Sequence, residues 1–490
     1  MIIPTDHSVI VISGTAITAV MAKVLDGRHT AMMLIVVFAA TFMDGLDASI
    51  VNVVLPEIGS GFSVDTATVS WVSITYMMVL AGTLVAFARI AADIGVRKVM
   101  AVGLAVFTLG SLFCGLSFSF ELLIVSRAVQ AVGAAMMAAS GPMCCTEHLP
   151  VAKLGFGLSI VTIGASFGFA IGPAIGGFIA EYTTWPWIFL INVPIGLLVA
   201  PLMLKAVPES SEKGGKIHLD VPGTVLLCSA IVLGTFAVET VSQSGMRTFT
   251  IIAAILCLAL LILFVRAERG KERPLLRLGM FARSDFVAIF ICLMMMNMAY
   301  MGLFYLLPFF GQICMGMSPL TVGTFLLISA LITAAFGMPI GRMSDRKGRK
   351  WFCVTAGLVT AVAFGLLAIF AGNMTFGMFL VIMVPMGLGW AFVGGPMASR
   401  LVEHAGDERD MASSLTNEAY YVGGAIGTAL AATLFTLFSG SGGINISDIT
   451  SSMMLDGFVP TAVICTLMVI AVAVISFAVR DGKDRCESDR

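Results

Sequence analysis

Fourteen apolar runs follow one another along the chain, separated by short polar or charged segments. Each run is about as long as the twenty or so apolar residues that a helix needs to cross the hydrocarbon core of a bilayer. The runs lie near residues 31–54, 67–88, 99–118, 121–143, 155–180, 187–206, 220–240, 249–266, 286–308, 318–341, 352–371, 375–398, 412–438 and 457–479. The pattern therefore predicts an all-α integral membrane protein with fourteen transmembrane helices.

The segment before the first run, residues 8–22, is apolar but too short to span a bilayer comfortably. It also lacks the basic start of a signal peptide. We expect either an interfacial helix or, if the natural protein starts at Met21, an over-extended N-terminus.

The lysines and arginines predict how the spans are oriented. With the N-terminus inside and fourteen spans, 26 of the 28 basic residues fall in inside segments, as cytoplasmic loops usually show. The two exceptions are Arg127, within a span, and Arg247. A fifteenth span would break this parity. We therefore expect a multi-pass protein of the plasma (cytoplasmic) membrane, embedded in the lipid bilayer, with both termini in the cytoplasm.

Composition supports the membrane assignment and excludes several functions. Apolar residues make up 58% of the 490 residues, charged residues make up 12%, and the mean hydropathy is +1.00. Such a chain lacks the polar surface of a soluble protein. The net charge of −1 argues against binding to nucleic acid. The ten cysteines form no CxxC pair and the five histidines form no HExxH motif, so we expect no metal and no cofactor.

A short charged segment occurs once in each half of the chain. ARIAADIGVRK (88–98) follows the second span and GRMSDRKGRK (341–350) follows the tenth, which places Asp93 and Asp345 252 residues apart. If spans one to six correspond to spans nine to fourteen, spans seven and eight are an insertion between two similar halves. Two such halves facing each other across a midplane site are typical of secondary transporters.

This repeat divides the chain into five regions. They are an N-terminal cytoplasmic or interfacial segment (1–29), a six-helix bundle (30–206), a linker with two extra helices (207–285), a second six-helix bundle (286–480) and a cytoplasmic tail (481–490).

Several motifs resemble those of the major facilitator superfamily, and more narrowly its fourteen-helix drug:proton antiporter branch. GRMSDRKGRK matches the superfamily's cytoplasmic loop signature, whereas the first copy has Arg89 for the leading glycine and has Gly95 one position early. LDASIVNVVLP (46–56) resembles the first-helix motif, SRAVQAVGAA (126–135) the fourth-helix arginine motif, and GASFGFAIGPAIGG (164–177) the antiporter motif of helix five. WPWIFLINVPIG (185–196) also follows the branch, except that Pro186 replaces an expected arginine.

The first predicted span contains two acids, Asp44 and Asp47, on neighbouring parts of one helix face. A carboxylate near the bilayer centre costs roughly 2.5–3.5 kcal/mol on insertion scales, so two carboxylates indicate a function. Arg127 is the only basic residue in the interior of a predicted span and is their natural partner. We expect one aspartate, preferably Asp47, to bind a proton from outside and release it inside while Arg127 stabilises the empty carboxylate. The alternative is a static ion pair that joins helices one and four.

Glycines recur every four residues along the fifth span, at Gly164, Gly168, Gly172 and Gly176. This spacing creates a smooth ridge on which another helix can lie closely, and Pro173 bends the helix locally. The spacing fits a gating role and ordinary helix packing equally well. The resemblance of GPAIGG, which includes Gly177, favours a seal of the outer half that limits leak.

The resemblance also implies that the two charged loops latch the cytoplasmic side closed in the outward-open state. The latch residues are Asp93, Arg97, Lys98, Gly341, Asp345, Arg346, Gly348 and Arg349. The alternative is that these charges only mark the cytoplasmic face. Because its glycine is displaced, we expect the first copy to form the less tight turn.

Other polar residues in the spans are candidates for lining a substrate path. They are Asn52, Gln130, Asn297, Glu418 and Tyr420. Asn297 lies close to the position that a 252-residue shift gives to Asp44. For Glu418 the alternative is a solvated position near the membrane surface.

These observations predict a proton-coupled exporter of small amphipathic or lipophilic compounds that works by alternating access, as a monomer. The alternative is a proton-coupled transporter of one metabolite, as exporter or importer on the same fold. The chain contains no Walker A sequence, which excludes an ATP-driven pump. We find no nucleophile–base pair that indicates an enzyme, and the internal duplication argues against a channel.

Overall fold

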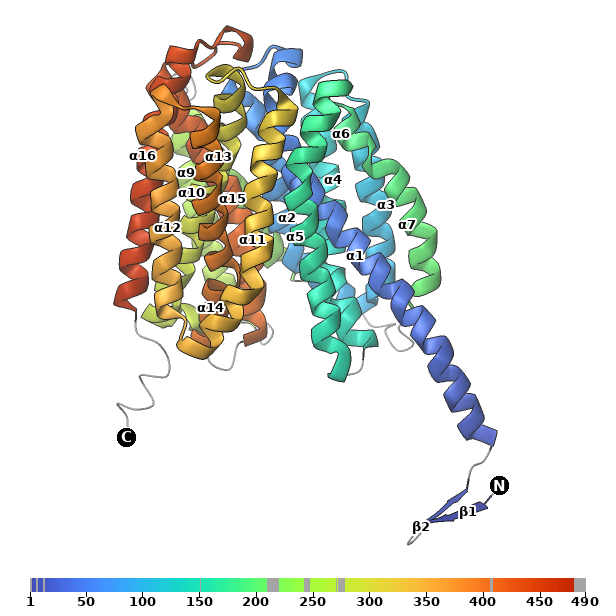
Figure 1. The fold of residues 1–490 in the computed structure, drawn as a ribbon. Coiled ribbons are helices and arrows are strands. Elements are labelled where there is room, and N and C mark those ends of the chain that lie inside the picture. The colour runs from blue at the N-terminus through green and yellow to red at the C-terminus, as the bar shows by residue number, and fades with distance from the viewer. Residues whose placement is uncertain are drawn as a thin grey trace.

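The structure is a computed structural model, and it describes residues 2–5, 8–11, 14–149, 151–208, 220–241, 247–269, 271, 278–405 and 409–479. Apart from a small antiparallel hairpin of β1 (Ile2–Thr5) and β2 (Ser8–Val11), these residues form helices joined by short connections (Figure 1). The helices are α1 (Gly14–Phe62), α2 (Thr66–Ile94), α3 (Val96–Gly115), α4 (Phe120–His148), α5 (Val151–Tyr182), α6 (Trp187–Leu190), α7 (Asn192–Ala206), α8 (Val221–Thr240), α9 (Arg247–Glu268), α10 (Ser284–Ile313), α11 (Pro319–Lys347), α12 (Lys350–Phe370), α13 (Phe376–Phe392), α14 (Ala398–His404), α15 (Arg409–Ser439) and α16 (Ser451–Ala478).

Each predicted span coincides with one helix or with two consecutive helices. Within the described residues, thirteen helical segments are long and apolar enough to cross a membrane, and α8 contributes a shorter apolar helix, Pro222–Val238. The prediction of an all-α membrane protein is therefore confirmed. The helix that contains the first span is longer than predicted, because α1 begins at Gly14 and not near residue 31.

Two predicted spans are not continuous α-helices. The sixth is divided into α6 and α7 at Ile191, and the twelfth passes through a π-helical segment, Val393–Met397, between α13 and α14. Pro396 lies in this segment. Proline has no amide hydrogen to donate, so a change of hydrogen-bonding pattern is expected beside it.

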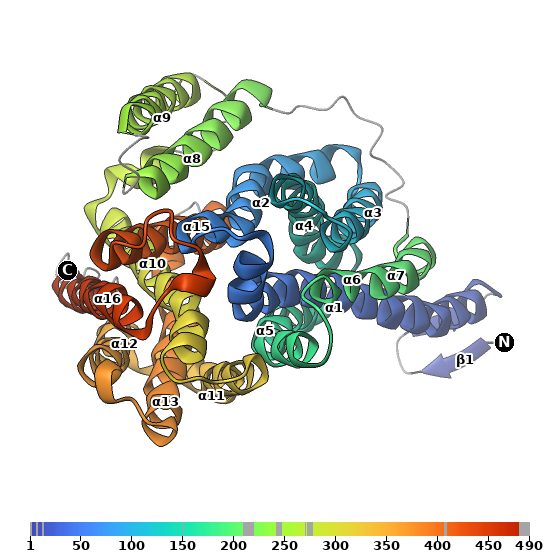
Figure 2. The same ribbon diagram turned by 90° about the horizontal axis from the view of Figure 1, so that it is seen from above.

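The helices form two groups that lie side by side, with a third pair outside them (Figures 1 and 2). We call α1–α7 the N-terminal bundle and α10–α16 the C-terminal bundle. The linker helices α8 and α9 pack against each other at the periphery, and α8 also contacts α2 and α15. The linker helices therefore touch both bundles without entering the space between them.

One ion-pair cluster ties the linker helices together at their ends. Lys271 donates to Asp220, at the start of α8, and to Glu268, at the end of α9, the latter at 2.8 Å. Asp220 also caps α8 by accepting from the Gly223 amide at 3.0 Å. Partial burial is the largest single influence and opposes the charged carboxylate. The hydrogen bonds from Lys271, Glu268 and the Gly223 amide, with the charge of Lys271, together outweigh it and lower the pKa of Asp220.

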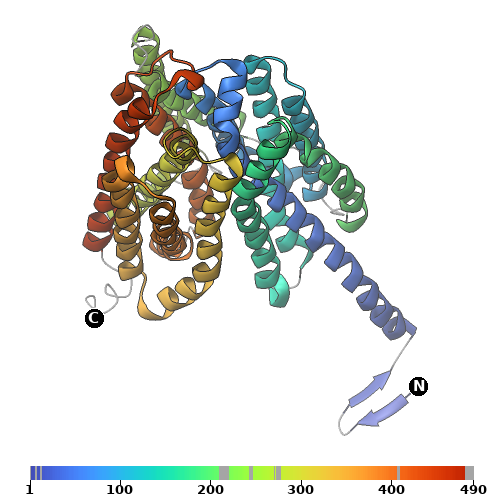
Figure 3. The ribbon, with the colours of Figure 1, turned by 45° about the horizontal axis from the view of Figure 1, so that its top comes forward.

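The two ends of the molecule differ in charge. The end where α2 meets α3 and α11 meets α12 carries the basic residues of both charged loops, and we call it the basic end. The opposite end contains the connections from α1 to α2 and from α15 to α16, and we call it the far end. The ribbons of the two bundles lie close together toward the far end and diverge toward the basic end (Figures 1 and 3).

The charged loops of both halves turn in the same way. Gly95 ends α2 with φ 102° and Gly348 ends α11 with φ 91°. A positive φ favours glycine, which has no Cβ. The expectation that the first loop forms the less tight turn is therefore wrong, because the displaced Gly95 takes the same backbone conformation as its counterpart.

The far end is closed by contacts between the bundles. Gln312 Nε2 donates to the Val53 carbonyl at 3.1 Å, and the Gly443 amide donates to Asp65 Oδ2 at 3.0 Å. The loop between α15 and α16 also inserts the Ile446 side chain, 4% exposed, so close to α1 that any Cβ at residue 59 would overlap it. In this conformation the bundles are therefore joined at the far end.

Candidate functional site

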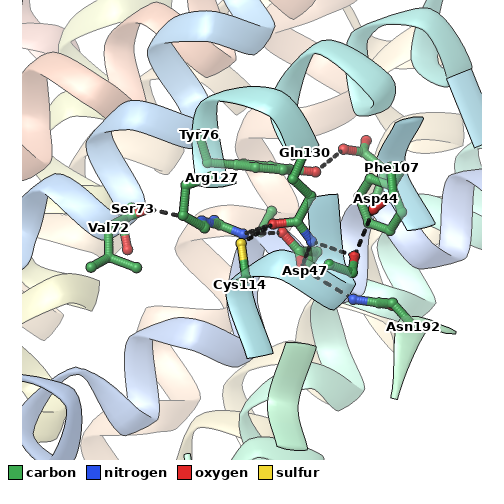
Figure 4. A network of polar contacts seen from close by, with 12 residues as sticks. Asp44, Asp47, Val72, Ser73, Tyr76, Phe107, Cys114, Arg127, Gln130 and Asn192 are labelled. Atoms are coloured by element: carbon green, nitrogen blue, oxygen red, sulfur yellow. Dashed lines mark hydrogen bonds and ion pairs between the residues drawn. The ribbon is translucent and has the colours of Figure 1, made fainter. Parts of the chain in front are cut away.

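Asp47 and Arg127 form a buried ion pair inside the N-terminal bundle (Figure 4). Arg127 Nη1, from α4, donates to Asp47 Oδ2, from α1, at 2.5 Å, and both residues are at most 1% exposed. The other carboxylate oxygen, Oδ1, accepts from Gln130 Nε2 at 2.7 Å and from Asn192 Nδ2 at 3.2 Å. Helices α1, α4 and α7 thus meet at a single carboxylate.

Further hydrogen bonds hold the guanidinium of Arg127 in place. Its Nη1 also donates to Gln130 Oε1 at 2.6 Å, its Nε donates to the Val72 carbonyl of α2 at 3.0 Å, and its central carbon lies 4.3 Å from the ring centre of Tyr76. Gln130 Nε2 in turn donates to Ser111 Oγ of α3 at 2.8 Å. A buried ion pair is tolerated only when its remaining polar groups are satisfied. Here four neighbouring helices supply the partners.

Asp44 has a different environment from Asp47, although it lies only one turn away on α1. Its Oδ1 accepts from the Tyr76 hydroxyl of α2 at 2.8 Å, and its Oδ2 accepts from the Tyr421 hydroxyl of α15 at 3.1 Å. Asp44 is 6% exposed. Tyr76 belongs to the same bundle as Asp44, whereas Tyr421 belongs to the other. The carboxylate of Asp44 therefore joins the two bundles.

The ion-pair partner of Arg127 was expected from the sequence, but several network members were not. Arg127 pairs with Asp47, while Asp44 is held by phenol groups. Tyr76, Asn192 and Ser111 are not among the site residues predicted from the sequence. A signal was available for Asn192, because an amide within an apolar run requires a buried partner.

The glycine ridge of α5 faces α1. A Cβ on any of Gly164, Gly168, Gly172 or Gly176 would collide with α1, at residues 38–50. At Gly168 the overlap is with the backbone carbonyl of Phe42, which cannot move aside as a flexible side chain can. The ridge therefore places the backbone of α5 directly against the segment of α1 that carries Asp44 and Asp47.

The end of the same motif faces the other bundle. The backbone of Pro173 lies against Gly323, and Gly177 lies against the backbone of Pro319 and Leu320, where an added Cβ would overlap in each case. Gly323, Pro319 and Leu320 all belong to α11. Hence α5 contacts α1 along its length and α11 near the far end.

The described contacts of the charged loops lie within each bundle. In the first loop, Arg97 donates to the Leu204 carbonyl of α7 at 2.6 Å. In the second, Arg349 bridges Asp345 at 3.0 Å and Glu403 of α14 at 2.7 Å. The remaining predicted latch residues are Asp93, Lys98, Gly341, Arg346 and Gly348, which lie at the same end.

The predicted substrate-path residues divide between the two bundles. In the N-terminal bundle, Gln130 belongs to the ion-pair network, and Asn52 Oδ1 accepts from Ser73 of α2 at 3.2 Å. In the C-terminal bundle, Asn297 is 2% exposed and Glu418 is 8% exposed. Asn297 Oδ1 and Glu418 Oε1 have no hydrogen-bond partner among the described residues. This burial excludes the solvated surface position considered for Glu418.

Tyr420 belongs to a cluster of aromatic rings in the C-terminal bundle. Its ring centre lies 6.3 Å from that of Trp390 and 5.2 Å from that of Tyr421. Trp390 stacks on Tyr300 at 4.1 Å. We call Tyr300, Trp390, Tyr420 and Tyr421 the aromatic cluster. The cluster lies beside the link between the bundles, because its member Tyr421 donates to Asp44.

Among the described residues, no group of three or more histidine, cysteine or acidic side chains is arranged to hold a metal. The two helical bundles with a buried charged network define a membrane transport protein. The chain belongs to the major facilitator superfamily, whose family model matches residues 37–428. This is a family of secondary transporters and not of enzymes.

Two curated relatives differ in the compounds that their names specify. The chain is 28% identical over 371 residues to the riboflavin transporter RibZ of Clostridioides difficile, covering 76% of this chain and 80% of the relative. It is 29% identical over 320 residues to MdtD of Escherichia coli O81, named as a multidrug resistance protein, covering 65% of this chain and 67% of the relative.

The fold also resembles a solved structure. A bacterial homologue of the human lysosomal transporter Spinster, in an inward-facing and unoccupied conformation, matches with a TM-score of 0.69 and 15% identity. The match covers 92% of this chain and 97% of the homologue. It confirms the fold predicted from the motifs.

Proposed function

We propose that this protein exports small amphipathic or lipophilic compounds in exchange for protons, by alternating access between its two bundles. The observation that carries the proposal is the buried Asp47–Arg127 pair beside Asp44. Intramembrane acids that face the interior of a bundle are the usual proton carriers of transporters. A proton moving down about 150 mV supplies roughly 3.5 kcal/mol, enough for a several-hundred-fold gradient of a neutral compound.

The proposed orientation follows from the basic residues. Because lysine and arginine concentrate in cytoplasmic loops, we assign the basic end and both termini to the cytoplasm of the cell. The bundles are joined at the far end and diverge at the basic end, so this conformation is inward-facing. The domain division follows as well, with bundles at 30–206 and 286–480, a two-helix linker at 207–285 and terminal segments at 1–29 and 481–490.

We assign three kinds of role to the site. Asp44 and Asp47 bind the transported proton, and Arg127 stabilises the empty carboxylate. The glycine ridge of α5 and its Pro173–Gly177 end seal the far side in the inward-facing state. The charged loops act as a latch that joins the bundles in the outward-facing state, which agrees with their contacts within each bundle here.

A second candidate function is proton-coupled transport of one metabolite, because RibZ is named for a single compound. The two candidates differ in selectivity and share the same coupling. The aromatic cluster supports the broader selectivity, because stacking on flat rings accepts compounds of different shapes.

Transport into proteoliposomes tests the proposal. With an acidic lumen, we expect saturable uptake of several unrelated amphipathic dyes, with abolition by a protonophore and in Asp47→Asn. Uptake of riboflavin alone from the same panel would favour the single-metabolite function. Dye uptake that is unaffected by the pH gradient would contradict proton coupling.

A further inference from the structure

Asp44 accepts hydrogen bonds from two phenols that lie on opposite sides of the bundle interface. The Tyr76 hydroxyl, 2.8 Å away, comes from the bundle that contains Asp44, and the Tyr421 hydroxyl, 3.1 Å away, comes from the other bundle. In both bonds a phenol hydroxyl donates to an oxygen of the Asp44 carboxylate. Separation of the bundles breaks only the bond to Tyr421.

The Tyr421–Asp44 bond differs in depth from the cross-bundle hydrogen bonds of the far end, one of which also has a carboxylate acceptor, Asp65. Since α1 runs from the basic end to the far end, Asp44 lies deeper in the interface than Val53 or Asp65. The phenol of Tyr305, by contrast, donates to the backbone carbonyl of Thr66. A backbone carbonyl does not titrate, whereas a carboxylate does.

The charged and titratable groups around Asp44 come from several helices. They are Asp47 on α1, Tyr76 on α2, Arg127 on α4, Tyr300 on α10, and Glu418, Tyr420 and Tyr421 on α15. Arg127 bonds to Asp47 and lies over the ring of Tyr76. The other helices packed against α1, namely α5, α7 and α11, carry their described charged side chains toward their ends, at Glu181, Lys205, Arg342, Asp345, Arg346 and Lys347.

We propose that the hydrogen bond from Tyr421 to Asp44 is a lock that holds the empty transporter in the inward-facing state. The proposal rests on the proton-exchange function given above. A hydrogen bond to an ionised carboxylate is about twice as strong as a neutral one. Binding of a proton to Asp44 converts the carboxylate into a neutral acid and weakens the lock.

The transported compound releases the same lock by acting on Tyr421, whereas the proton acts on Asp44. The ring of Tyr421 contacts Tyr420, which continues to Trp390 in the aromatic cluster. A flat molecule that stacks on these rings moves the Tyr421 phenol away from Asp44. Tyr421 is therefore a positioning residue that senses both the proton and the cargo.

This arrangement satisfies the central requirement of exchange. An exchanger must change conformation with either ligand bound and must remain still when it is empty. With Asp44 ionised and no cargo present, the lock is closed and the bundles stay joined. Either ligand opens it, so each transition carries a proton or a molecule of cargo.

The substitution Tyr421→Phe tests the lock, because it removes the hydroxyl and keeps the ring. We expect its counterflow exchange to remain within a few fold of wild type. We expect its gradient-driven accumulation to fall about tenfold or more, the loss that one hydrogen bond to a charged group predicts. The cause is slippage of the empty carrier. Full accumulation by Tyr421→Phe would overturn the proposal.

A conformational measurement separates failure of the lock from failure of the proposed function. Spin labels at Ser60→Cys and Ser447→Cys, both exposed at the far end, report its opening without any substrate, on a background whose accessible native cysteines are serine. In the wild type we expect a closed far end at high pH and an added open population at low pH. In Tyr421→Phe we expect the open population at both pH values.

Two matched phenol variants complete the design. Tyr305→Phe removes a cross-bundle bond to a backbone carbonyl, which does not titrate. We expect its open population to be higher than that of the wild type by the same amount at low and high pH, so that the difference between the two pH values remains. Tyr76→Phe removes the bond to Asp44 from within the same bundle and also keeps the response. A pH response lost equally in Tyr76→Phe and Tyr421→Phe would overturn the lock, whatever compound the protein transports.

Discussion

The two acids of α1 are held differently from the candidate polar residues of the C-terminal bundle. Both bundles also contain other buried polar atoms without a partner among the described residues, such as Asn192 Oδ1 and Thr360 Oγ1. In the N-terminal bundle, both carboxylate oxygens of Asp47 are hydrogen-bonded, and so are both oxygens of Asp44. In the C-terminal bundle, Asn297 Oδ1 and Glu418 Oε1 have no partner among the described residues. A satisfied network is rigid, and an unsatisfied buried group is costly until something binds it. On the proposed function, we therefore expect substitutions of Asp44 and Asp47 to change energy coupling, and substitutions of Asn297 and Glu418 to change ligand contact.

The contrast stands out because the bundles share their packing. In the N-terminal bundle, glycines spaced by four bring α5 onto α1. In the C-terminal bundle, Gly423 and Gly427 bring α15 onto α10, where an added Cβ at either would lie too close to Met294 or Met298. The helix carrying Asp44 and the helix carrying Asn297 therefore have similar supports. The difference between the bundles lies in side-chain chemistry.

The largest expected effect comes from removing the acid of the ion pair. Asp47→Asn abolishes uptake driven by a pH gradient, because an amide does not carry the proton. It also leaves Arg127 without a counter-charge, which lowers the unfolding free energy by about 3 kcal/mol. Proteoliposome uptake and thermal unfolding in detergent measure the two effects.

The matched control for this variant lies in the other bundle. Asn297→Ala removes a buried amide from α10, and we expect it to change the KM for cargo while the dependence on the pH gradient remains. Full gradient-driven uptake by Asp47→Asn would place energy coupling elsewhere. Equal loss of the gradient dependence in both variants would remove the distinction between the bundles.

A smaller effect is expected from adding a methyl group to a glycine at either close helix contact, α5 on α1 or α15 on α10. Gly168→Ala and Gly427→Ala each force a Cβ against a backbone carbonyl of the neighbouring helix, at Phe42 and Met298 respectively. Overpacking of this kind costs about 1–3 kcal/mol. Gly337→Ala on α11 is the control, because nothing lies within 4 Å of its Cβ. Thermal unfolding should rank the control as most stable, and equal stability of all three would contradict close packing at these supports.

The smallest expected effect is a pH dependence outside the membrane spans. The pKa of Asp220 is lowered, so its ion pair with Lys271 stabilises the start of α8 above about pH 4 and is lost as the pH falls further. The pKa of Lys271 is raised, so the contribution of the ion pair to the stability of α8 is present at neutral pH and is lost only above about pH 10. Partly exposed pairs contribute below about 1 kcal/mol.

Hydrogen exchange of the Gly223 and Thr224 amides measures this local effect. Protection should fall at acid pH in the wild type and be low throughout in Asp220→Asn. Unchanged protection in the variant would show that the ion pair does not hold the end of α8.

The sequence was sufficient for the spans and for part of the site. Spans follow from apolar length, and Arg127 followed as the partner of the two acids from the absence of other basic residues in the interiors of the predicted spans. The choice between Asp44 and Asp47 depends on how α1 is rotated against α4, which a three-residue spacing does not define. The contact from Tyr421 to Asp44 joins residues 377 positions apart. Such a pairing depends on how the two bundles meet.

The proposed separation of tasks between the two bundles has a consequence for how such proteins diversify. The acids lie in the first half of the gene product, and the aromatic cluster lies in the second. In the middle of the interface, the described polar connection between the acids of α1 and the aromatic cluster is the hydroxyl of Tyr421. We expect a hybrid of the first half of this protein and the second half of a relative with a tyrosine at the position of Tyr421 to be functional. Its proton coupling should follow the first parent, and its choice of cargo should follow the second.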